Sequence, residues 1–314
     1  MSVAVAFARG GDSQRAVALY RSLRDAQRPD GSFAPRIAPD GHPPDSRPDQ
    51  FEAIGWYAWG FTQLLQALAA DGHSVWHAQL WEEFGPSIVA AGEQLLAATA
   101  AGLPPPSSDY WERQETELTL ATAALTLAGL SAIAQLGREL GVLVENESEL
   151  IAAAAKRSAR LREQIIEYFG PSYGRYGHGT APDAAIAFLL PPFQDRALPG
   201  ARKAWRESLA RQYVPASGGY APGAGWKDDG ISWTPETTLH AWVAAEWAGS
   251  HSAESQGERQ RAIDILQWIA AHSTAVGAIP EKVGPGGQPA AVAPLAWSAA
   301  NVVLAIDALS RERK

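Results

Sequence analysis

The sequence predicts an all-α protein whose antiparallel helices form a ring, an (α/α) toroid. Ala- and Leu-rich segments in which apolar residues recur with a period near 3.6 make up most of the chain. The period-two alternation that is typical of strands is nearly absent. Long and short connections alternate, and short connections join antiparallel neighbours, so the long loops should gather at one end. The lack of a fixed-period repeat argues against a regular solenoid.

The first half of the chain is expected to be helical with two long interruptions. Residues 1–11 are apolar and should be part of a helix. The predicted helices that follow are 12–27, 50–70, 75–100, 114–140 and 147–169, and the long loops are 28–49 and 101–113. The prolines at 104–106 stop one helix, because proline cannot continue it. Residues 107–109 (Ser-Ser-Asp) are good caps for the next, which should begin near Gln114.

The second half continues the pattern with shorter helices. The predicted helices are 182–190, 200–212, 235–248, 254–273 and 294–311. The long loops are 170–181, 213–234 and 274–293, and the short connections of the whole chain are 71–74, 141–146, 191–199 and 249–253. The last long loop contains a Gly- and Pro-rich turn at 284–289, and a short hairpin inside a loop is compatible with the sequence.

Composition limits the function classes. With 314 residues and 46% hydrophobic composition, and with no Ser/Gly linker or charge run, the chain is expected to form one domain over 1–314. The formal charge of -8 and the scattered Lys and Arg argue against a nucleic-acid groove. The lack of cysteine excludes disulfides and thiolate metal sites, and the seven histidines show no metal spacing.

The sequence also gives expectations about location. Residues 1–11 lack a basic lead and a cleavage site, so we do not expect a signal peptide. We find no stretch of roughly 18 uncharged apolar residues, the length that a membrane span needs, and so expect no membrane partner. A cytoplasmic location follows as the default. The oligomeric state stays open, although exposed edges on an incomplete ring would favour an oligomer.

Two glutamates in long loops are the candidate catalytic residues. Glu112 follows Trp111 directly, and Glu281 follows Pro280, with Trp297 further on. Two carboxyl groups that face each other across an aromatic-lined pocket are what acid-base cleavage of a glycosidic bond requires. Each also has a simpler interpretation. An acid before a helix complements the helix dipole, and Glu281 is also explained as a solvated loop residue paired with Lys282.

Four of the twelve tryptophans lie in or beside Gly/Pro-rich loops and are candidates for a binding surface: Trp111, Trp226, Trp233 and Trp297. Sugar rings present flat C–H faces that stack on indole, although large rings more often fill core positions. The loop from Trp226 to Trp233 also contains Asp228 and Asp229, which suit a polyol and equally suit an ordinary turn.

Five segments in chain order match the motifs of one known family. They are Asp30-Gly31-Ser32-Phe33 with Gln50, Glu52 and Gly55; Asp109-Tyr110-Trp111-Glu112; Asp183 with 189–193; Tyr220 with 232–235 and Thr237; and 279–283 with 294–298. Together they resemble glycoside hydrolase family 15, the group of glucoamylases and bacterial glucodextranases and trehalases. The last segment is the most specific, and the similarity spans most of the chain.

The resemblance implies an (α/α)6 toroid and an inverting hydrolase for an α-glucoside or related glycan, with no metal or organic cofactor. It assigns the general acid to Glu112 and the general base to Glu281. The carbohydrate-binding residues that we expect with them are Gln50, Glu52, Asp109, Tyr110, Trp111, Tyr220, Trp226, Trp233 and Trp297. Gln50 and Glu52 are also explained as a helix cap or a solvated face.

Two departures from the family's motifs weaken this transfer. The family has an Arg-Asp pair that grips the terminal sugar near an early helix, and by this resemblance the sequence is expected to begin just past that point. The family's Arg before the aromatic that matches Tyr220 is here Gly219. A ring incomplete by one or two helices at the N-terminus would fit the first departure. Loss of an Arg clamp removes positioning on which catalysis depends.

Two alternatives therefore stay open. One is a non-catalytic carbohydrate-binding relative that keeps the toroid and has lost the sugar clamp. The other is a terpenoid-cyclase-like toroid, because the segment 27–33 resembles the Gln-Asp-Gly-aromatic motif of that class. That motif occurs once here, whereas such proteins usually repeat it, and loop Trp, Asp and Gly favour a sugar.

Overall fold

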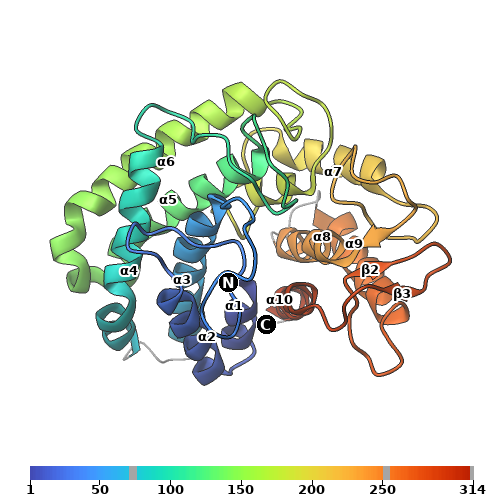
Figure 1. Cartoon of the computed structure of the whole chain (residues 1–314), viewed down its shortest axis with the longest axis horizontal. Coiled ribbons are helices and arrows are strands. Elements are labelled where there is room, and N and C mark those ends of the chain that lie inside the picture. Colours follow the sequence, from blue (N-terminus) through green and yellow to red (C-terminus); the bar gives the residue numbers. More distant parts are fainter. Residues whose placement is uncertain (71–75, 250–254, 312–314) are drawn as a thin grey trace. The chain divides into compact units, whose positions relative to one another are not determined.

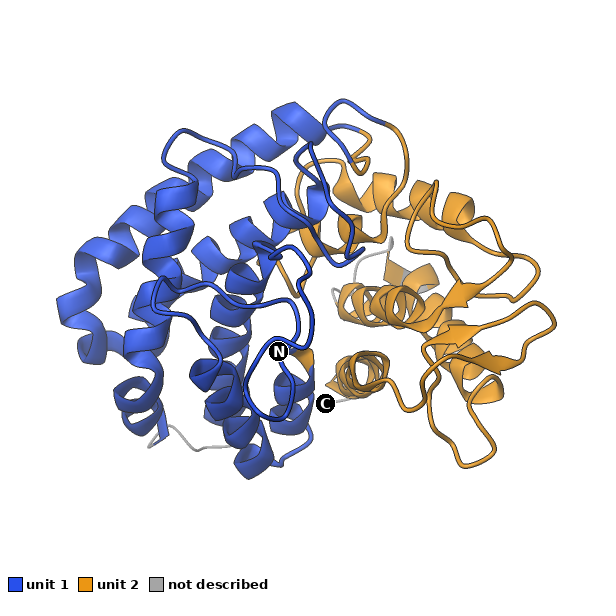
Figure 2. Cartoon of the chain, viewed as in Figure 1, with its two compact units in different colours: residues 1, 3–171, 176–179 blue, residues 2, 172–175, 180–314 orange. Residues whose placement is uncertain are grey.

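The computed structural model describes residues 1–70, 76–249 and 255–311, which form two compact units (Figure 2). The first unit comprises residues 1, 3–171 and 176–179, and the second comprises residues 2, 172–175 and 180–314. The expectation of a single domain over 1–314 stays a prediction. The expected short connection at 71–74 lies outside the described residues. The expected connection at 249–253 also lies outside them, except for residue 249.

The first unit is a group of helices packed around one apolar helix (Figure 1). Its elements are α1 (Ser2–Arg9), α2 (Ser13–Asp25), α3 (Glu52–Ala70), α4 (Trp76–Ala98), α5 (Leu120–Leu140), the 3-10 helix η1 (Gly141–Glu147) and α6 (Ser148–Phe169). Helix α5 contacts α3, α4 and α6. Every residue from Leu120 to Leu130 is buried. Small and aliphatic side chains around its whole circumference explain why α5 forms the core of this unit.

Helices α3 and α5 approach each other closely because two glycines face one another. A Cβ atom added at Gly55 would lie 2.0 Å from the carbonyl oxygen of Leu125. A Cβ atom added at Gly129 would lie 2.6 Å from the Cα atom of Gly55. Backbones can come this close only where no side chain separates them, so both positions require glycine.

Helix α5 begins later than the sequence predicts. The expected start near Gln114 is wrong, because the helix begins at Leu120 and residues before it form a loop. The side chain of Thr119 accepts a hydrogen bond from the backbone N–H of Thr122 at 3.3 Å, which satisfies one of the free donors at the helix start. The loop that carries Glu112 therefore extends several residues further than expected.

The second unit is built around α8 and a small sheet. Its elements are the 3-10 helix η2 (Ala184–Leu189), α7 (Ala201–Gln212), β1 (Ser232–Trp233), α8 (Thr234–Ala248), α9 (Gln256–Ala271), β2 (Lys282–Val283), β3 (Pro289–Ala290) and α10 (Ala296–Arg311). Helix α8 contacts α9, α10 and η2, and nearly all of its residues are buried. The helix expected at 182–190 is the short 3-10 helix η2, capped by Asp183, which accepts from the Ala185 N–H at 2.8 Å.

The small antiparallel sheet fixes the loop that carries Glu281. Ser232 pairs with Val283, Trp233 pairs with Lys282, and β2 continues into β3 as a hairpin. Gly286 and Gly287 have φ of 82° and 85°, which glycine adopts without strain and which lets the turn close. The hairpin that the sequence left open is thus present in the loop 274–293.

One helical stretch, Leu120–Phe169, passes a length and composition test for a membrane span. It contains an 18-residue window with a mean hydropathy of 1.5. The expectation that no stretch is long and apolar enough is therefore wrong for α5. The core helix of a soluble protein passes the same test. Since 78% of that window is buried inside the protein, packing against the other helices explains its apolar composition.

Candidate active site

Glu112 sits in a loop whose shape is set by Asp109. The side chain of Asp109 is fully buried and accepts a hydrogen bond from the Trp111 N–H at 3.0 Å. The backbone N–H of Glu112 donates to the Asp109 carbonyl oxygen at 2.7 Å, and Glu112 has φ of 56°. A positive φ in a residue other than glycine is uncommon and is held here by this turn.

The same loop is tied to the start of α3, which brings several predicted residues together. The side-chain amide of Gln50 donates to the Asp109 carbonyl oxygen at 3.0 Å. The Phe51 N–H donates to Ser107 Oγ at 2.9 Å. Glu52 begins α3 and is 3% exposed, so the solvated-face interpretation of this residue does not hold. Gln50 and the segment from Asp109 to Glu112, which includes the half-buried Tyr110, thus form one local cluster in the first unit.

Two arginines that were not predicted from the sequence form ion pairs with the carboxylate of Glu112. Arg36 donates from Nη2 to Oε1 and Oε2 at 2.9 and 2.8 Å, and from Nε to Oε1 at 3.1 Å. Arg47 contacts Oε2 from Nη1. They lie 76 and 65 positions away in the sequence, so no local pattern pointed to them. The Glu112 side chain is 33% exposed.

Glu281 is held by backbone bonds at the N-terminus of α8 in the second unit. Its N–H donates to the Val292 carbonyl oxygen at 2.8 Å, and its carbonyl oxygen accepts from the Thr234 N–H at 3.0 Å. Thr234 is fully buried, and its hydroxyl donates to the Pro280 carbonyl oxygen at 2.5 Å. The backbone is therefore anchored on both sides while the Glu281 side chain remains 28% exposed.

A cation and two indoles lie next to Glu281. The ammonium group of Lys282 is 4.0 Å from Glu281 Oε1 and 4.1 Å from the centre of the Trp233 ring. Trp226 packs edge-on against Trp233, with ring centres 5.2 Å apart. The structure thus brings Trp226 and Trp233 together with the base candidate. Trp297 lies in the first turn of α10 and is half-buried.

A second carboxyl group, Glu236, lies in the first turn of α8 and was not predicted. It is 3% exposed, and burial raises its pKa to about 8. The nearby carboxyl groups of Asp183 and Glu281 shift the pKa of Glu236 in the same direction. Asp183 itself is paired with Arg175 at 2.6 Å, with both side chains buried. A Thr-Pro-Glu helix start reads as ordinary capping, so the sequence gave no functional signal for Glu236.

Tyr220 lies against α9. It lines a shallow pocket of about 210 Å³ with Gly257, Gln260, Arg261, Asp264 and Ile265. Burial raises the pKa of the Tyr220 phenol. At the preceding position, a Cβ on Gly219 would lie 2.7 Å from Trp268 and 2.9 Å from the side chain of Ser232. This backbone has no room for the arginine that the family motif places there.

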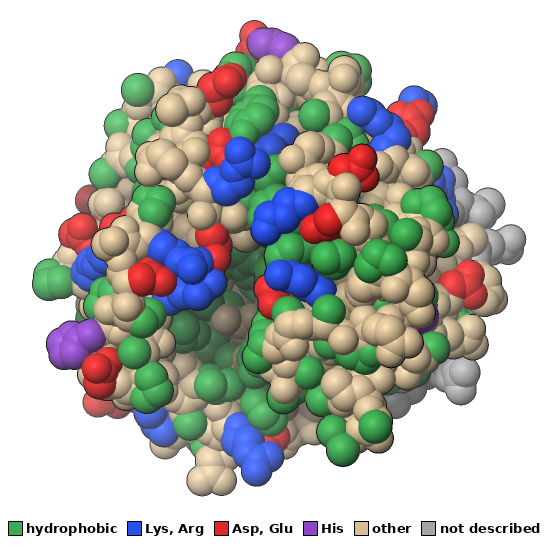
Figure 3. Space-filling view, turned by 45° about the vertical axis from the view of Figure 1, so that its right-hand side comes forward, with side chains coloured by type: hydrophobic (Ala, Val, Ile, Leu, Met, Phe, Trp, Pro, Cys, Tyr) green, Lys and Arg blue, Asp and Glu red, His purple; other side chains and the backbone are tan. Residues whose placement is uncertain are grey.

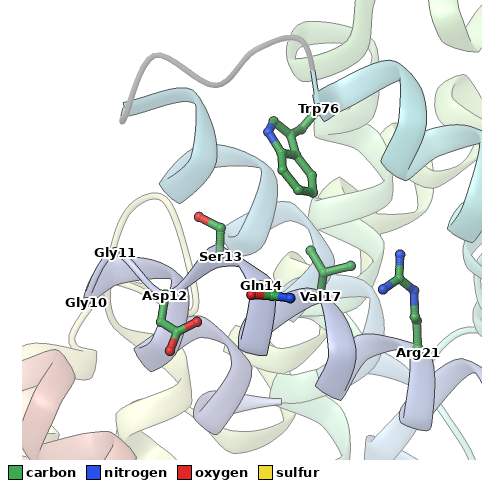
Figure 4. A pocket seen from close by; sticks show the side chains of 8 residues that line it. All are labelled: Gly10, Gly11, Asp12, Ser13, Gln14, Val17, Arg21 and Trp76. Atoms are coloured by element: carbon green, nitrogen blue, oxygen red, sulfur yellow. The ribbon is translucent and has the colours of Figure 1, made fainter.

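A second hollow does not contain the predicted site. It measures about 780 Å³ in the first unit and is lined by Gly10, Gly11, Asp12, Ser13, Gln14, Val17, Arg21 and Trp76 (Figure 4). The Arg21 guanidinium donates a hydrogen bond from Nε to Glu83 Oε1 at 2.6 Å. Across the described ranges, no group of three or more His, Cys, Asp or Glu side chains is placed to hold a metal ion.

Figure 3 shows one face of the molecule on which Lys and Arg side chains are interspersed with Asp and Glu. A nucleic-acid site usually gathers its cations in one continuous patch. The cations nearest the candidate residues instead lie beside acidic side chains. Arg36 and Arg47 contact Glu112, and Lys282 lies beside Glu281.

No family model and no curated protein matches the sequence. The structure is similar to a glycosidase, with a TM-score of 0.75 and 20% identity over 98% of this chain and 86% of that chain. It is similar to a glucoamylase from Saccharomycopsis fibuligera, with a TM-score of 0.74 and 12% identity over 99% of this chain and 84% of the other.

A bacterial glucoamylase complexed with acarbose gives a TM-score of 0.72 and 14% identity over 99% of this chain and 48% of that protein. These similarities define the class of fold. The chain is an all-α protein with the toroid fold of glycosidases and glucoamylases, as the motif resemblance predicted. At such identities the likeness shows the fold, and the reaction has to be argued from the residues.

Proposed function

We propose that the protein is an inverting glycoside hydrolase that acts on an α-glucoside or a related glycan, with Glu112 as general acid and Glu281 as general base. The observation that carries the proposal is the fold, which is similar to glycosidases and glucoamylases over nearly the whole chain. One of these glycosidase structures is a complex with glucose, and one glucoamylase structure is a complex with acarbose. A sugar ligand is therefore the first class to test.

The base role rests on the surroundings of Glu281. Its backbone is fixed on both sides, its side chain is partly exposed, and a lysine ammonium lies 4.0 Å away. A general base must accept a proton from water while it is held in one position. In an inverting reaction this water attacks the face of the sugar opposite the leaving group. Trp226 and Trp233 are half-buried indoles beside it, and a sugar ring that stacks on Trp233 would have to displace the Lys282 ammonium, which lies 4.1 Å from the ring centre.

The acid role requires a change at Glu112. A general acid protonates the leaving oxygen, and inversion needs the two carboxyl groups roughly 6.5–9.5 Å apart at one sugar ring. Both Glu112 oxygens are engaged by Arg36 and Arg47. We therefore propose that substrate binding breaks the ion pairs between these guanidinium groups and the Glu112 carboxyl group. Sugar hydroxyls are suitable alternative acceptors for them.

The first experiment is a screen of hydrolysis by wild type, Glu112→Gln and Glu281→Gln on maltose, isomaltose, trehalose, dextran and starch. We expect reducing-sugar release by wild type, a β-anomer as the first product by NMR, and a loss of about 10²–10⁴-fold in kcat for each variant. The matched controls are Glu117→Gln, which is an exposed residue of the loop that carries Glu112, and Glu246→Gln on α8. Retained turnover in either catalytic variant would contradict the assigned roles.

A non-catalytic carbohydrate-binding protein is the second candidate. The specific observations that favour it are the ion pairs on Glu112 and the absence of space for a side chain at Gly219. The same variants separate the two candidates. A binding protein releases no sugar from any of these glycans, binds one of them by calorimetry, and keeps that affinity in Glu112→Gln and Glu281→Gln.

A further inference from the structure

The N-terminus of α8 holds a buried carboxyl group that the proposed reaction does not use. Glu236 is 3% exposed. Its Oε2 atom is buried and has no hydrogen-bond partner among the residues that the structure describes. A charged oxygen in such a place would lose its hydration without compensation, so a carboxyl group there keeps its proton.

Backbone bonds hold this turn of α8 close to Glu281. The Thr234 N–H and hydroxyl contact the carbonyl oxygens of Glu281 and Pro280 at 3.0 and 2.5 Å. On the other side, the Asn301 amide of α10 donates to the Pro235 carbonyl oxygen at 3.3 Å. These bonds fix the residue two positions before Glu236 and the residue next to it. These bonds tie together the two segments that carry Glu236 and Glu281, and the Glu281 carboxyl group is close enough to raise the pKa of Glu236.

The carboxyl groups near Glu236 have partners of their own. Asp183, at the start of η2, forms its ion pair with Arg175 at 2.6 Å. Glu281, before β2, has the Lys282 ammonium at 4.0 Å. A charge on Glu236 would lie near both of these acids and would have no cation paired with it in the described part of the chain. Like charges so placed repel.

The titratable group one turn along α8 does not supply a cation. His240 is fully buried and its Nδ1 accepts a hydrogen bond from Trp205 Nε1 at 3.2 Å. Burial, together with Arg261 on α9, lowers the pKa of His240 to about 3, so the ring is neutral. Burial raises the pKa of Glu236 to about 8, which is the range where its ionisation becomes observable.

We infer that Glu236 is a positioning residue for Glu281. Its protonated carboxyl group keeps an unpaired negative charge away from the start of α8, and its ionisation repels the Glu281 carboxylate. The inference rests on the proposed function in which Glu281 is the general base. Loss of the proton at alkaline pH displaces Glu281 from the position in which it activates water. Turnover then falls on the alkaline side without any change in the acid Glu112.

The kinetic test compares kcat/KM against pH for wild type, Glu236→Gln and the control Glu246→Gln on the same helix. The substrate is a glycosyl fluoride, whose leaving group needs no proton from Glu112, so ionisation of Glu112 does not add an alkaline limb of its own. We expect the wild-type value to fall about tenfold per pH unit above the ionisation of Glu236. In Glu236→Gln this fall disappears or moves to higher pH, while the value at neutral pH stays within about threefold and the acidic limb is unchanged. Glu246→Gln should follow wild type. An alkaline limb that is identical in Glu236→Gln overturns the inference.

A second measurement does not depend on turnover. In protein with ¹³C-labelled glutamate carboxyl groups, wild type should show one carboxyl signal that titrates near pH 8, and it should be absent in Glu236→Gln. The Glu281 signal, identified by its loss in Glu281→Gln, should shift in the same pH range only when Glu236 is present. If no carboxyl group titrates there, the inference is wrong. If both shifts occur but no glycoside is hydrolysed, the proposed function fails and the link between the two residues stands.

Discussion

At the scale of single residues, two glutamates near the start of α8 differ because of burial. Glu281 is 28% exposed beside a lysine, whereas Glu236 is 3% exposed beside other acids. Both follow a proline in the sequence. The sequence predicts Glu281 through its loop and motif. The role of Glu236 depends on the packing of η2, α8 and the β2 loop, which no spacing in the chain reports.

The stability of the protein should depend on pH through Glu236. Burial raises its pKa from the ordinary value of 4.5 to about 8, so between these values the folded state binds a proton that the unfolded state has lost. The free energy of unfolding contributed by this group is then greatest below pH 4.5, falls as pH rises and is lost above about pH 8. The loss is of the order of 3–5 kcal/mol.

Urea unfolding of wild type and Glu236→Gln at several values between pH 4.5 and pH 8.5 measures this effect. The variant should gain stability relative to wild type as pH rises, because its amide does not ionise. Curves that stay parallel over this range would mean that Glu236 has an ordinary pKa in the folded protein.

The acid candidate shows a different limit of sequence reasoning. The cluster of Gln50 with the segment from Asp109 to Glu112 was predicted, because the motif gives both parts in order. Arg36 and Arg47 were missed, since they reach Glu112 from a long irregular loop. Charged residues in such a loop carry no periodicity that would indicate which of them turn toward a site.

At the scale of elements, strong periodicity bounded by Gly or Pro gave accurate limits. The helix predicted at 200–212 is α7 (Ala201–Gln212), and the one predicted at 235–248 is α8 (Thr234–Ala248). The start of α5 was misplaced because the polar residues after Glu112 suit a first helical turn by composition. The threonine cap at 119 decides the start instead, and several threonines near it made that cap hard to single out.

The close packing of α3 and α5 makes a specific prediction at Gly129. Gly129→Ala should lower the free energy of unfolding by about 1–3 kcal/mol, because its Cβ would lie 2.6 Å from the Cα of Gly55 and the helices would have to separate. Gly137→Ala is the control on the same helix, where a Cβ meets only the Ile151 side chain at 3.9 Å.

The control should be neutral or stabilising by up to about 1 kcal/mol, since alanine favours a helix over glycine. Thermal and urea unfolding of both variants measure the difference. Equal effects at the two positions would show that α3 and α5 are not in backbone contact at Gly129.

At the scale of the whole molecule, the fold is similar to proteins of 12–20% identity, although no family model matches the sequence. Helix packing tolerates extensive substitution if the pattern of apolar positions is kept. That explains why periodicity and a few motifs in chain order predicted the fold. Substrate preference depends on individual loop side chains, which vary freely on such a scaffold, and it was not predictable in the same way.

The acid and base roles proposed for Glu112 and Glu281 can be separated by the leaving group. A leaving group such as fluoride departs without protonation, so it should restore turnover to Glu112→Gln by at least about tenfold relative to a sugar leaving group. Glu281→Gln should gain nothing, because the water still lacks its base.

In the double variant, fluoride should likewise restore nothing. The kcat of the double variant should stay close to that of the less active single variant, because the effects of residues that act on one transition state are not additive. Rates for a glycosyl fluoride and the matching disaccharide, measured with all four proteins, decide this. If fluoride restored Glu281→Gln and left Glu112→Gln unchanged, the acid and base assignments would have to be exchanged.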